Sequence, residues 1–460
     1  MRADHLIAVT RFGLCPRAGD LAQAAGDPRG YVRAQCSDLS AAEIVSPRTI
    51  TVDDAASAYK DLFAEIRAAR ERVEANPTDD NRMAVKDATR DRNMFGRQLL
   101  RTELALRYRQ GVHTDAPFVE RLALFWSNHF AIDVNANMRT RFSGPLYERE
   151  AIRPHVLGPF RNLLMAATVH PAMLNYLDNA ASVGPNSRRA RRAKRELDIN
   201  ENHGRELLEL HTLGVDGGYT QADVIEASKI MTGWIGPLRR GKFDKLYDPR
   251  THEPGYREVL GITYPAAGDD QLRWLIDDLS VHPKTAAFVT GKLARHFVGD
   301  HASDELKARL ADVFLETGGD LRAVSLALVE SDEAWQPSPR KMVPPYDFAV
   351  ACGRVLGLRG LPGQLVNRLT GALAQQVWRT PSPAGWPDDD DAFSGGDAFM
   401  ERIDFANMVA QRSGVRDVRA LADKVFGDTL EPDVAQAIRR AESTDQALVL
   451  LLMSPVLHRR

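Results

Sequence analysis

Polar side chains that could bind a ligand or move protons are concentrated in one short stretch of the chain, residues 200–211. The stretch contains carboxylates, imidazoles, amides and one guanidinium, contributed by Asn200, Glu201, Asn202, His203, Arg205, Glu206, Glu209 and His211. Two carboxylates in one site can act as acid and base when their surroundings separate their pKa values. An arginine beside them can hold an anionic group or orient a carboxylate. The three glutamates and the arginine are therefore candidate catalytic residues.

A helix over residues 199–213, termed the polar helix below, would position these side chains. Asp198 and Glu201 have the spacing of a capping box at its start. A glycine-rich turn then leads to a second helix, whose first residues show the same capping pattern at Thr220 and Asp223. Two helices joined by a tight turn are thus expected around the candidate site.

The polar helix presents three faces at 100° per residue. One face carries Asn200, His203, Gly204, Leu207, Leu210 and His211. Glu206 and Glu209 lie on a second face, and Glu201 and Arg205 on a third. One interpretation is a solvated helix with weak ion pairs at i,i+4 spacing, and the spacing alone favours it. The other is a helix buried among its neighbours, with its carboxylates in a polar network or a site.

A second polar cluster lies upstream, in an aromatic helix expected to begin near Pro117. Trp126 and His129 fall on one side of this helix, and Asn128 is rotated away from both. One interpretation is a core helix whose His129 makes a single hydrogen bond. The other places His129 in a catalytic site and predicts that it faces Glu206 across a polar pocket. The candidate ligand-binding residues are then Trp126, Asn128, Asn200, Asn202 and Trp234.

Several stretches resemble one bacterial family, named domain of unknown function 1800. They are NENHGRELLELHTLGVDGGYTQADV followed by TGW, RLALFWSNHF at 121–130, and YEREAIRPHVLGPFRNLLMAATVHPAMLNYLDN at 147–179, with TRFGLCPRAGDL and SPAGWPDD as further pieces. The resemblance covers nearly the whole chain. Family members often carry an aromatic residue where His203 stands and sometimes a phenylalanine where His211 stands, so neither is expected to be an essential ligand. The family brings no settled activity, and the resemblance therefore indicates a place for a site rather than a reaction.

The resemblance also implies a partner. Members of this family are often encoded beside a second one, domain of unknown function 1501, which looks like a relative of sulfatases or phosphatases. Two functions remain open. The protein is an enzyme or small-ligand protein acting with such a sulfatase-like partner, or it is a non-catalytic partner or scaffold in a two-protein system. In the second case the polar residues fix helix packing, and a charged arm binds the partner.

Composition excludes several classes of protein. There are 60 Lys and Arg residues against 62 Asp and Glu, a formal charge of −2, which gives no global argument for binding nucleic acid or an anionic membrane. Three widely spaced cysteines cannot form a disulfide framework or a Cys-rich zinc site. No apolar run approaches the roughly 18–20 residues that span a bilayer. The common nucleotide, hydrolase and zinc-protease motifs are missing, so no metal ligands are predicted and a cofactor stays unknown.

The pattern of apolar residues predicts a mainly α fold, a multi-helix globular bundle with a small β-hairpin insertion near 240–265. Residues 243–247 are expected to pair with 259–264. The whole chain, 1–460, is expected to be one domain, with sub-units 1–234 and 235–460 as the alternative. Residues 53–110 are highly charged and predict a helical arm, broken at Asn76-Pro77-Thr78.

Late in the chain, a rigid aromatic loop contains Trp378 and Trp386. A hydrophobic brace over the helices is favoured for it, and a cover over a cleft is the alternative. The four aspartates at 388–391 lack the ligand spacing of an EF-hand and predict a solvated turn. His296 lies near the C-terminus of a helix, where the helix dipole alone would explain it.

Two further expectations concern the surface and the location of the protein. Six of the nine residues 188–196 are basic, which predicts a solvated loop, or alternatively a docking surface for an acidic partner or polyanion. The N-terminal sequence MRADHLIAVTRFGL lacks the continuous apolar region of a signal peptide. We therefore expect a cytoplasmic protein, with export in the folded state on a signal-bearing partner as the alternative.

Overall fold

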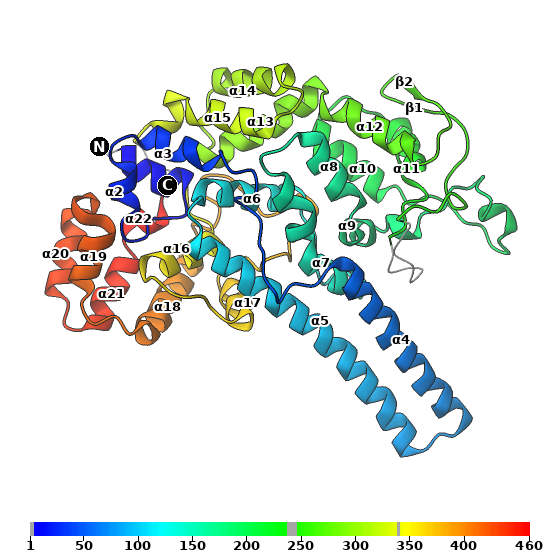
Figure 1. Ribbon diagram of the computed structural model, residues 1–460, viewed down its shortest axis with the longest axis horizontal. Helices are drawn as coiled ribbons and strands as arrows, with labels where there is room; N and C mark the ends of the chain where they lie inside the picture. The colour runs from blue at the N-terminus through cyan, green and yellow to red at the C-terminus, as the bar shows by residue number, and fades with distance from the viewer. Residues whose placement is uncertain (1–3, 237–245, 338–340) are drawn as a thin grey trace.

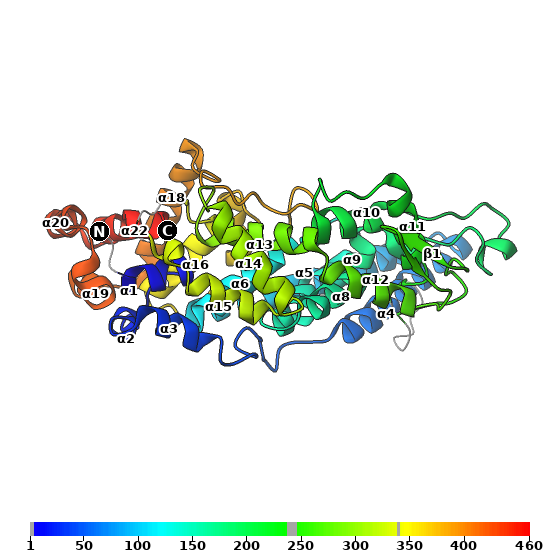
Figure 2. The same cartoon turned by 90° about the horizontal axis from the view of Figure 1, so that it is seen from above.

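The computed structural model describes residues 4–236, 246–337 and 341–460, and helices make up most of it, which confirms the predicted mainly α fold. Figures 1 and 2 show an elongated body from which one pair of helices extends as an arm. The larger core cluster joins buried residues from Leu6 to Leu457. No helix in the described ranges is long and apolar enough to cross a membrane.

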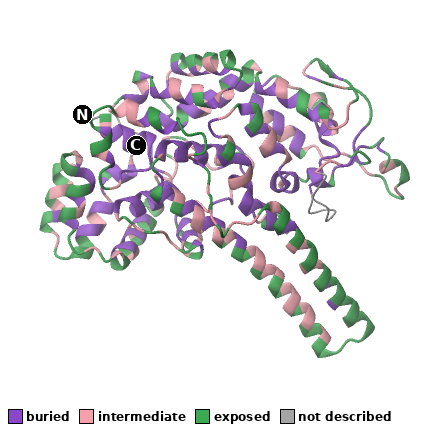
Figure 3. Ribbon diagram, in the orientation of Figure 1, coloured by how far each residue is buried: buried purple, intermediate pink, exposed green. Residues whose placement is uncertain are grey.

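The arm consists of α4 (Val52–Ala75) and α5 (Asp79–His113), which pack side by side with their turn at the predicted break. A capping box at Thr51 starts α4, and the Thr78 side chain caps α5. Most residues along the outer part of the arm are exposed or half-buried (Figure 3). The second half of α5 enters the body, where residues such as Tyr108 are buried, and the start of α4 packs against α7.

Helix α6 (Pro117–His129) lies inside the body and is buried along almost its whole length, because apolar residues cover most of its surface. The other elements of the N-terminal half are short and follow the chain around it. They are α1 (Asp4–Ile7), η1 (Ala8–Phe12), α2 (Asp20–Ala24), α3 (Pro28–Gln35), α7 (Thr140–Tyr147), η2 (Glu148–Ile152), η3 (Arg153–His155), α8 (Phe160–Val169), α9 (Pro171–Tyr176), η4 (Asn179–Ala181) and η5 (Ala190–Arg192).

The polar helix begins at Asn202 rather than at residue 199, as α10 (Asn202–Leu208), and continues as the π-helical turn η6 (Glu209–Leu213). The predicted cap at Asp198 is wrong. The Asp198 carboxylate accepts a hydrogen bond from the next amide, that of Ile199, at 2.8 Å, and Asn200 Oδ1 accepts from the Asn202 amide at 3.0 Å. Local turns therefore satisfy these side chains before the helix starts.

Helix α11 (Gln221–Met231) packs against α10 and opens with the capping box predicted at Thr220 and Asp223. Gly204 permits a close approach of the two helices. A Cβ built at Gly204 would lie 2.1 Å from Ser228 Oγ and 2.9 Å from the Ser228 nitrogen. The glycine in the polar helix thus has a packing role that any side chain would disturb.

A small β-hairpin lies beside α11, as predicted for the insertion, but its strands differ from the prediction. β1 (Arg257–Val259) pairs with β2 (Ile262–Tyr264) in antiparallel register, with Val259 opposite Ile262. Leu260 and Gly261 both have positive φ, as in the tight turns that suit the twist of a hairpin. Of the predicted partner segment 243–247, residues 243–245 lie outside the described ranges, and Tyr247 forms a bridge with Trp234 rather than with β2.

The C-terminal half continues as helices around the body. In Figure 1, α12 to α15 run along the top, and α18 to α21 cluster at the end farthest from β1 and β2. The bounds are α12 (Asp270–Ser280), α13 (Pro283–Phe297), α14 (Asp304–Glu316), α15 (Leu321–Val329), η8 (Asp332–Trp335), α16 (Pro345–Val355), α17 (Gly363–Ala372), α18 (Gly396–Ser413), α19 (Val418–Phe426), η9 (Gly427–Thr429), α20 (Pro432–Arg440), α21 (Thr444–Leu452) and α22 (Pro455–His458).

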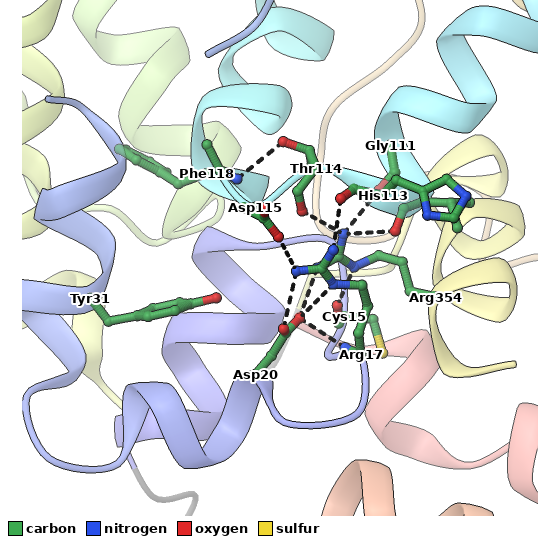
Figure 4. A network of polar contacts seen from close by, with 12 residues as sticks. Cys15, Arg17, Asp20, Tyr31, Gly111, His113, Thr114, Asp115, Phe118 and Arg354 are labelled. Carbon is green, nitrogen blue, oxygen red and sulfur yellow. Dashed lines mark hydrogen bonds and ion pairs between the residues drawn. The ribbon is translucent and has the colours of Figure 1, made fainter. Parts of the chain in front are cut away.

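A buried arginine of α16 fixes the N-terminal segment to the body (Figure 4). Arg354 donates to the carbonyl oxygens of Cys15 at 2.7 Å and Gly111 at 3.0 Å, and to the Asp20 carboxylate at 2.9 Å. Arg17 approaches the same carboxylate of Asp20 from its exposed side, at 3.3 Å. The segment TRFGLCPRAGDL is therefore held in place by a structural ion-pair network.

Candidate functional site

The glutamates of the polar helix are half-buried and make contacts typical of a helix surface. Glu201 Oε2 lies 3.3 Å from Arg205 Nη2, the i,i+4 pair expected of a solvated helix. Glu209 accepts a hydrogen bond from the Tyr219 hydroxyl at 2.8 Å. Burial, together with the charge of Glu209, raises the pKa of Glu206. The polar helix therefore combines a buried histidine face with a half-exposed acidic one.

The histidine face of the polar helix is buried, together with His129 of α6. Neither ring nitrogen of His203 or His211 has a hydrogen-bond partner among the described residues. His129 Nε2 donates to the His211 carbonyl oxygen at 3.1 Å, and burial lowers the pKa of all three imidazoles. This agrees with the interpretation of His129 as a core residue with one hydrogen bond. No hydrogen bond or ion pair in the described ranges joins His129 to Glu206, so their cooperation stays a prediction.

All five candidate ligand-binding residues have structural contacts, and one of them also lines a cavity. Trp126 is 1% exposed and packs among core aromatic rings. Trp234 is also buried, against Tyr247. Asn200 and Asn202 form the turn at the start of the polar helix. The fifth, Asn128, lines a cavity.

Asn128 joins α6 to the late aromatic loop, residues 378–388. Its amide nitrogen donates to the Trp386 carbonyl oxygen at 2.9 Å, and its Oδ1 accepts from the Trp386 amide at 2.8 Å. Gly385 is required beside it, because its φ is 87° and a Cβ there would lie 2.4 Å from the Asn128 carbonyl oxygen. The start of the loop is also fixed to the segment after α6, because the Val134 amide donates to the Trp378 carbonyl oxygen at 2.9 Å. Two segments that are about 250 residues apart are thus locked together.

Glu148 of η2 is the centre of a buried ionic network below this loop. Its two oxygens lie 2.8 Å from Arg107 Nε and 2.7 Å from Arg153 Nη2. The Ser127 hydroxyl and the Trp378 indole N–H donate to it at 2.8 and 2.9 Å. Burial acts to raise the pKa of Glu148, but the two arginines outweigh it and lower the pKa to about 2. A carboxylate with so many donors has a structural role, holding helices and loop in register.

A cavity of about 90 Å³ lies between α6, α16 and the aromatic loop. Its polar lining residues are Arg107, Ser127, Asn128, His296, Tyr346, Asp347, Gln375, Gln376, Thr380 and Asp388, and Trp378 and Trp386 form aromatic walls. One water needs roughly 10–15 Å³ of such space, so the cavity has room for several waters or a small ligand. The aromatic loop therefore both braces α6, as predicted, and covers a cavity, which was the alternative.

A histidine and an aspartate meet in the wall of this cavity. His296 Nδ1 lies 2.8 Å from Asp388 Oδ2, and Lys341 Nζ lies 3.0 Å from Asp388 Oδ1. Burial acts to raise the pKa of Asp388, but His296 and Lys341 hold it well below its usual range. The predicted solvated turn is therefore wrong for Asp388, although Asp391 is 81% exposed. His296 Nε2 is buried and has no hydrogen-bond partner among the described residues.

Tyr346 of α16 supplies a second buried polar group without a partner, its hydroxyl, in the described part of the chain. Burial raises the pKa of this hydroxyl, which stays protonated at neutral pH. The guanidinium of Arg107 lies 4.1 Å from the centre of the Tyr346 ring and is neutralised by Glu148 on its other side. Asp347 is neutralised by Arg121, at 2.9 Å. The charged groups of the lining thus have partners, whereas His296 Nε2 and the Tyr346 hydroxyl do not.

The sequence did not predict His296, Tyr346, Asp388 or Arg107 as site residues, because each belongs to a different segment and has no local pattern of its own. The SPAGWPDD stretch was the available signal, since it contains Trp386 and Asp388. Within the described ranges, no three or more His, Cys, Asp and Glu side chains have an arrangement that could hold a metal ion. The groups present offer a hydrogen-bonded imidazole and a phenol, which can accept and donate a proton.

The basic segment, residues 188–195, lies at the surface, as predicted. Five of its six cations are exposed and Arg189 is half-buried, and none has an ion pair in the described part of the chain. It is not a structureless loop, because Ala190–Arg192 forms a 3-10 turn and the Arg189 amide donates to the Arg250 carbonyl oxygen at 2.8 Å.

Comparison with protein families gives one match along nearly the whole chain. The matching family is described as "Protein of unknown function (DUF1800)" and covers residues 7–458. Neither the curated proteins nor the solved structures contain a match. The resemblance inferred from the separate motifs is therefore confirmed, and each of those motifs now has a place in the fold.

Proposed function

The chain belongs to the DUF1800 family of proteins of unknown function, and we propose that it binds a small, polar, uncharged molecule beneath residues 378–388 and transfers a proton to or from it. The proposal keeps the idea of a small-ligand site but moves it from the polar helix to the cavity beside α6. Asn128 is the one predicted site residue that also lines this cavity. The polar helix then supports the site through His129 and its contact with the His211 carbonyl.

One observation carries the proposal. Three polar atoms of the cavity's lining residues are buried and have no hydrogen-bond partner in the described ranges, namely His296 Nε2, the Tyr346 hydroxyl and Thr380 Oγ1. The first two belong to groups that can exchange a proton. Leaving a buried polar group unsatisfied costs about 1–3 kcal/mol, so a folded protein retains such groups in one cavity only for a reason. A ligand that donates a hydrogen bond to the imidazole and accepts one from the phenol would satisfy both.

The roles follow from the contacts. Asp388 accepts the Nδ1–H of His296, which leaves Nε2 as the basic nitrogen, and an aspartate orients a catalytic histidine in the same way in serine hydrolases. His296 then acts as the general base toward a hydroxyl or a water, and Tyr346 donates a hydrogen bond to the oxygen that gains charge. The charges of Arg107 and Asp347 are already balanced, which favours an uncharged ligand.

Hydrolysis of three 4-nitrophenyl compounds, the acetate, the phosphate and the sulfate, tests this function. We expect turnover of the neutral acetate ester alone. His296→Asn should lower kcat/KM by about 10²–10⁴-fold, the usual contribution of a general base. His301→Asn is the matched control, because His301 also lies near an aspartate, Asp390 at 3.6 Å, but does not line the cavity. Equal turnover by His296→Asn, or a preference for the phosphate or sulfate, contradicts the proposal.

A second function is favoured by the arm. We propose that α4 and α5 also bind a partner protein, for which the sulfatase-like family named by the resemblance is the first candidate. The support is the length and exposure of the arm, whose outer part contributes little to the core (Figure 3). Co-purification of the two proteins, with and without charge reversals on the outer arm, tests it, and undiminished co-purification of the reversed arm contradicts it.

We further propose a cytoplasmic location, with export in the folded state as the alternative. The support is limited to the three cysteines, which are buried and form no disulfide, as suits a reducing compartment. Fractionation of cells with and without the partner gene distinguishes the two locations. Recovery of the protein outside the cytoplasm contradicts the cytoplasmic location. Recovery outside the cytoplasm in cells that lack the partner gene also contradicts transport by the partner.

A further inference from the structure

Two adjoining hollows run along α5 where the arm enters the body, on a surface distinct from the cavity described above. Their volumes are about 740 and 310 Å³, and they share Arg101 and Gln364. One wall is α5, and the other is the start of α17 with the loop before it. The walls are in tight contact, since a Cβ on Gly363 would lie 1.7 Å from the Arg101 carbonyl oxygen. The two hollows are termed the arginine groove below.

The groove has a strong local charge. Six exposed arginines line it, and none of its lining residues is acidic: the six are Arg48, Arg97, Arg101, Arg109, Arg359 and Arg368. In the described ranges none of these guanidinium groups forms an ion pair, whereas Arg107 and Arg149, which also lie near the base of the arm, do. The chain as a whole has a formal charge of −2, so this accumulation is a local feature. Unpaired cations held together by a folded frame attract an anionic partner.

The apolar residues at the bottom of the groove indicate which kind of anionic partner could bind there. Apolar side chains lie between the arginines, among them Leu100, Leu104, Leu106 and Leu361. No aromatic side chain is part of either lining, so the stacking surfaces that single-stranded nucleic acids use are missing there. Carboxylates match the forked geometry of arginine, and leucine-like side chains match the floor. We propose that the arginine groove binds an acidic segment of a partner protein, with apolar residues between its carboxylates.

The length of the groove fits such a segment. Arg97 and Arg109 lie twelve positions apart on α5, which corresponds to about 18 Å along a helix. An extended peptide covers that distance with about five or six residues. A segment of this length can place two or three carboxylates on the arginines while its alternate side chains face the floor.

A fluorescently labelled twelve-residue peptide, four repeats of Glu-Glu-Leu, is the probe for this surface. We expect fluorescence anisotropy to show binding at low salt that weakens as salt is added. Arg101→Glu with Arg359→Glu should weaken binding about tenfold or more, since both residues line the larger hollow. Circular dichroism of this variant should match the wild type, because exposed charges without partners contribute little to stability.

The matched control is Arg416→Glu with Arg440→Glu, which makes the same change in net charge at two exposed positions, one in the connection before α19 and one at the end of α20. This variant should bind the peptide as the wild type does. Equal losses in both double variants would overturn the proposal, because the peptide would then sense only net charge. Absence of peptide binding to the wild type, or tighter binding of a twelve-residue oligothymidylate than of the peptide, would overturn it as well.

Discussion

Glu148 is a buried carboxylate and Asp388 a half-buried one, and their surroundings give them different roles. Glu148 receives hydrogen bonds from two arginines, a serine and a tryptophan, and no site remains on it for a ligand. Asp388 contacts Lys341 and His296. The other ring nitrogen of His296, Nε2, has no hydrogen-bond partner among the described residues. Neither role could be predicted from the sequence, because the partners of Glu148 extend to 230 residues away and His296 lies 92 residues from Asp388. The sequence pointed instead to Glu206 and Glu209, whose spacing is visible locally.

The hydroxyl of Tyr346 gives a prediction at the same scale. Tyr346→Phe should leave the free energy of unfolding unchanged or raise it, because it removes a buried hydroxyl that has no partner in the described ranges. Tyr264→Phe is the matched control, since the Tyr264 hydroxyl donates to Asp278 at 2.8 Å, and it should cost about 1–2 kcal/mol. Urea unfolding of both variants measures the difference. An equal loss in the two variants would show that the Tyr346 hydroxyl is structural.

At the scale of the element, the sequence was informative wherever the signal was local. The break of the arm, the capping box of α11 and the insertion of a β-hairpin all follow from short patterns, and the structure contains them. The errors lie where two local solutions compete. Asp198 could cap a helix but accepts instead from the following amide, and β2 pairs with the adjacent β1 rather than with a more distant segment. At these positions the competing caps and turns differ by small free energies, which the sequence does not reveal.

The packing of α10 on α11 gives a prediction at this scale. Gly204→Ala should destabilise the protein by about 1–3 kcal/mol, because the new methyl group would overlap Ser228 and push the helices apart. Gly291→Ala, in α13, is the matched control, since a Cβ there meets no atom within 4 Å, and it should stabilise by about 0.5–1 kcal/mol. Thermal unfolding of both variants measures whether each substitution lowers or raises the stability of the protein. A stabilised Gly204→Ala would contradict the packing role.

At the scale of the molecule, helical periodicity was enough to predict the fold class but not the cavity. Apolar spacing acts within one helix, whereas the cavity needs α5, α6, α13, α16 and the aromatic loop together. Its residues extend from Arg107 to Asp388 in the sequence. Ion pairs join several of these segments: Arg121 of α6 lies 2.9 Å from Asp347 of α16, and His296 of α13 lies 2.8 Å from Asp388 of the loop. The predicted catalytic pairing of His129 with Glu206 remains a prediction, and the cavity is lined by neither.

The central claim is that His296 presents a basic nitrogen to the cavity, and the protonation of its ring tests this most directly. Nitrogen-15 NMR of histidine-labelled protein at pH 8, where unperturbed imidazoles are neutral, distinguishes the two ring nitrogens, and His296→Asn assigns the signals. We expect a proton on Nδ1 of His296, bound to Asp388, and none on Nε2. Asp388→Asn should remove this preference. A proton found on Nε2, with Nδ1 bare, would contradict the proposed site, because the nitrogen that meets the ligand could then not accept its proton.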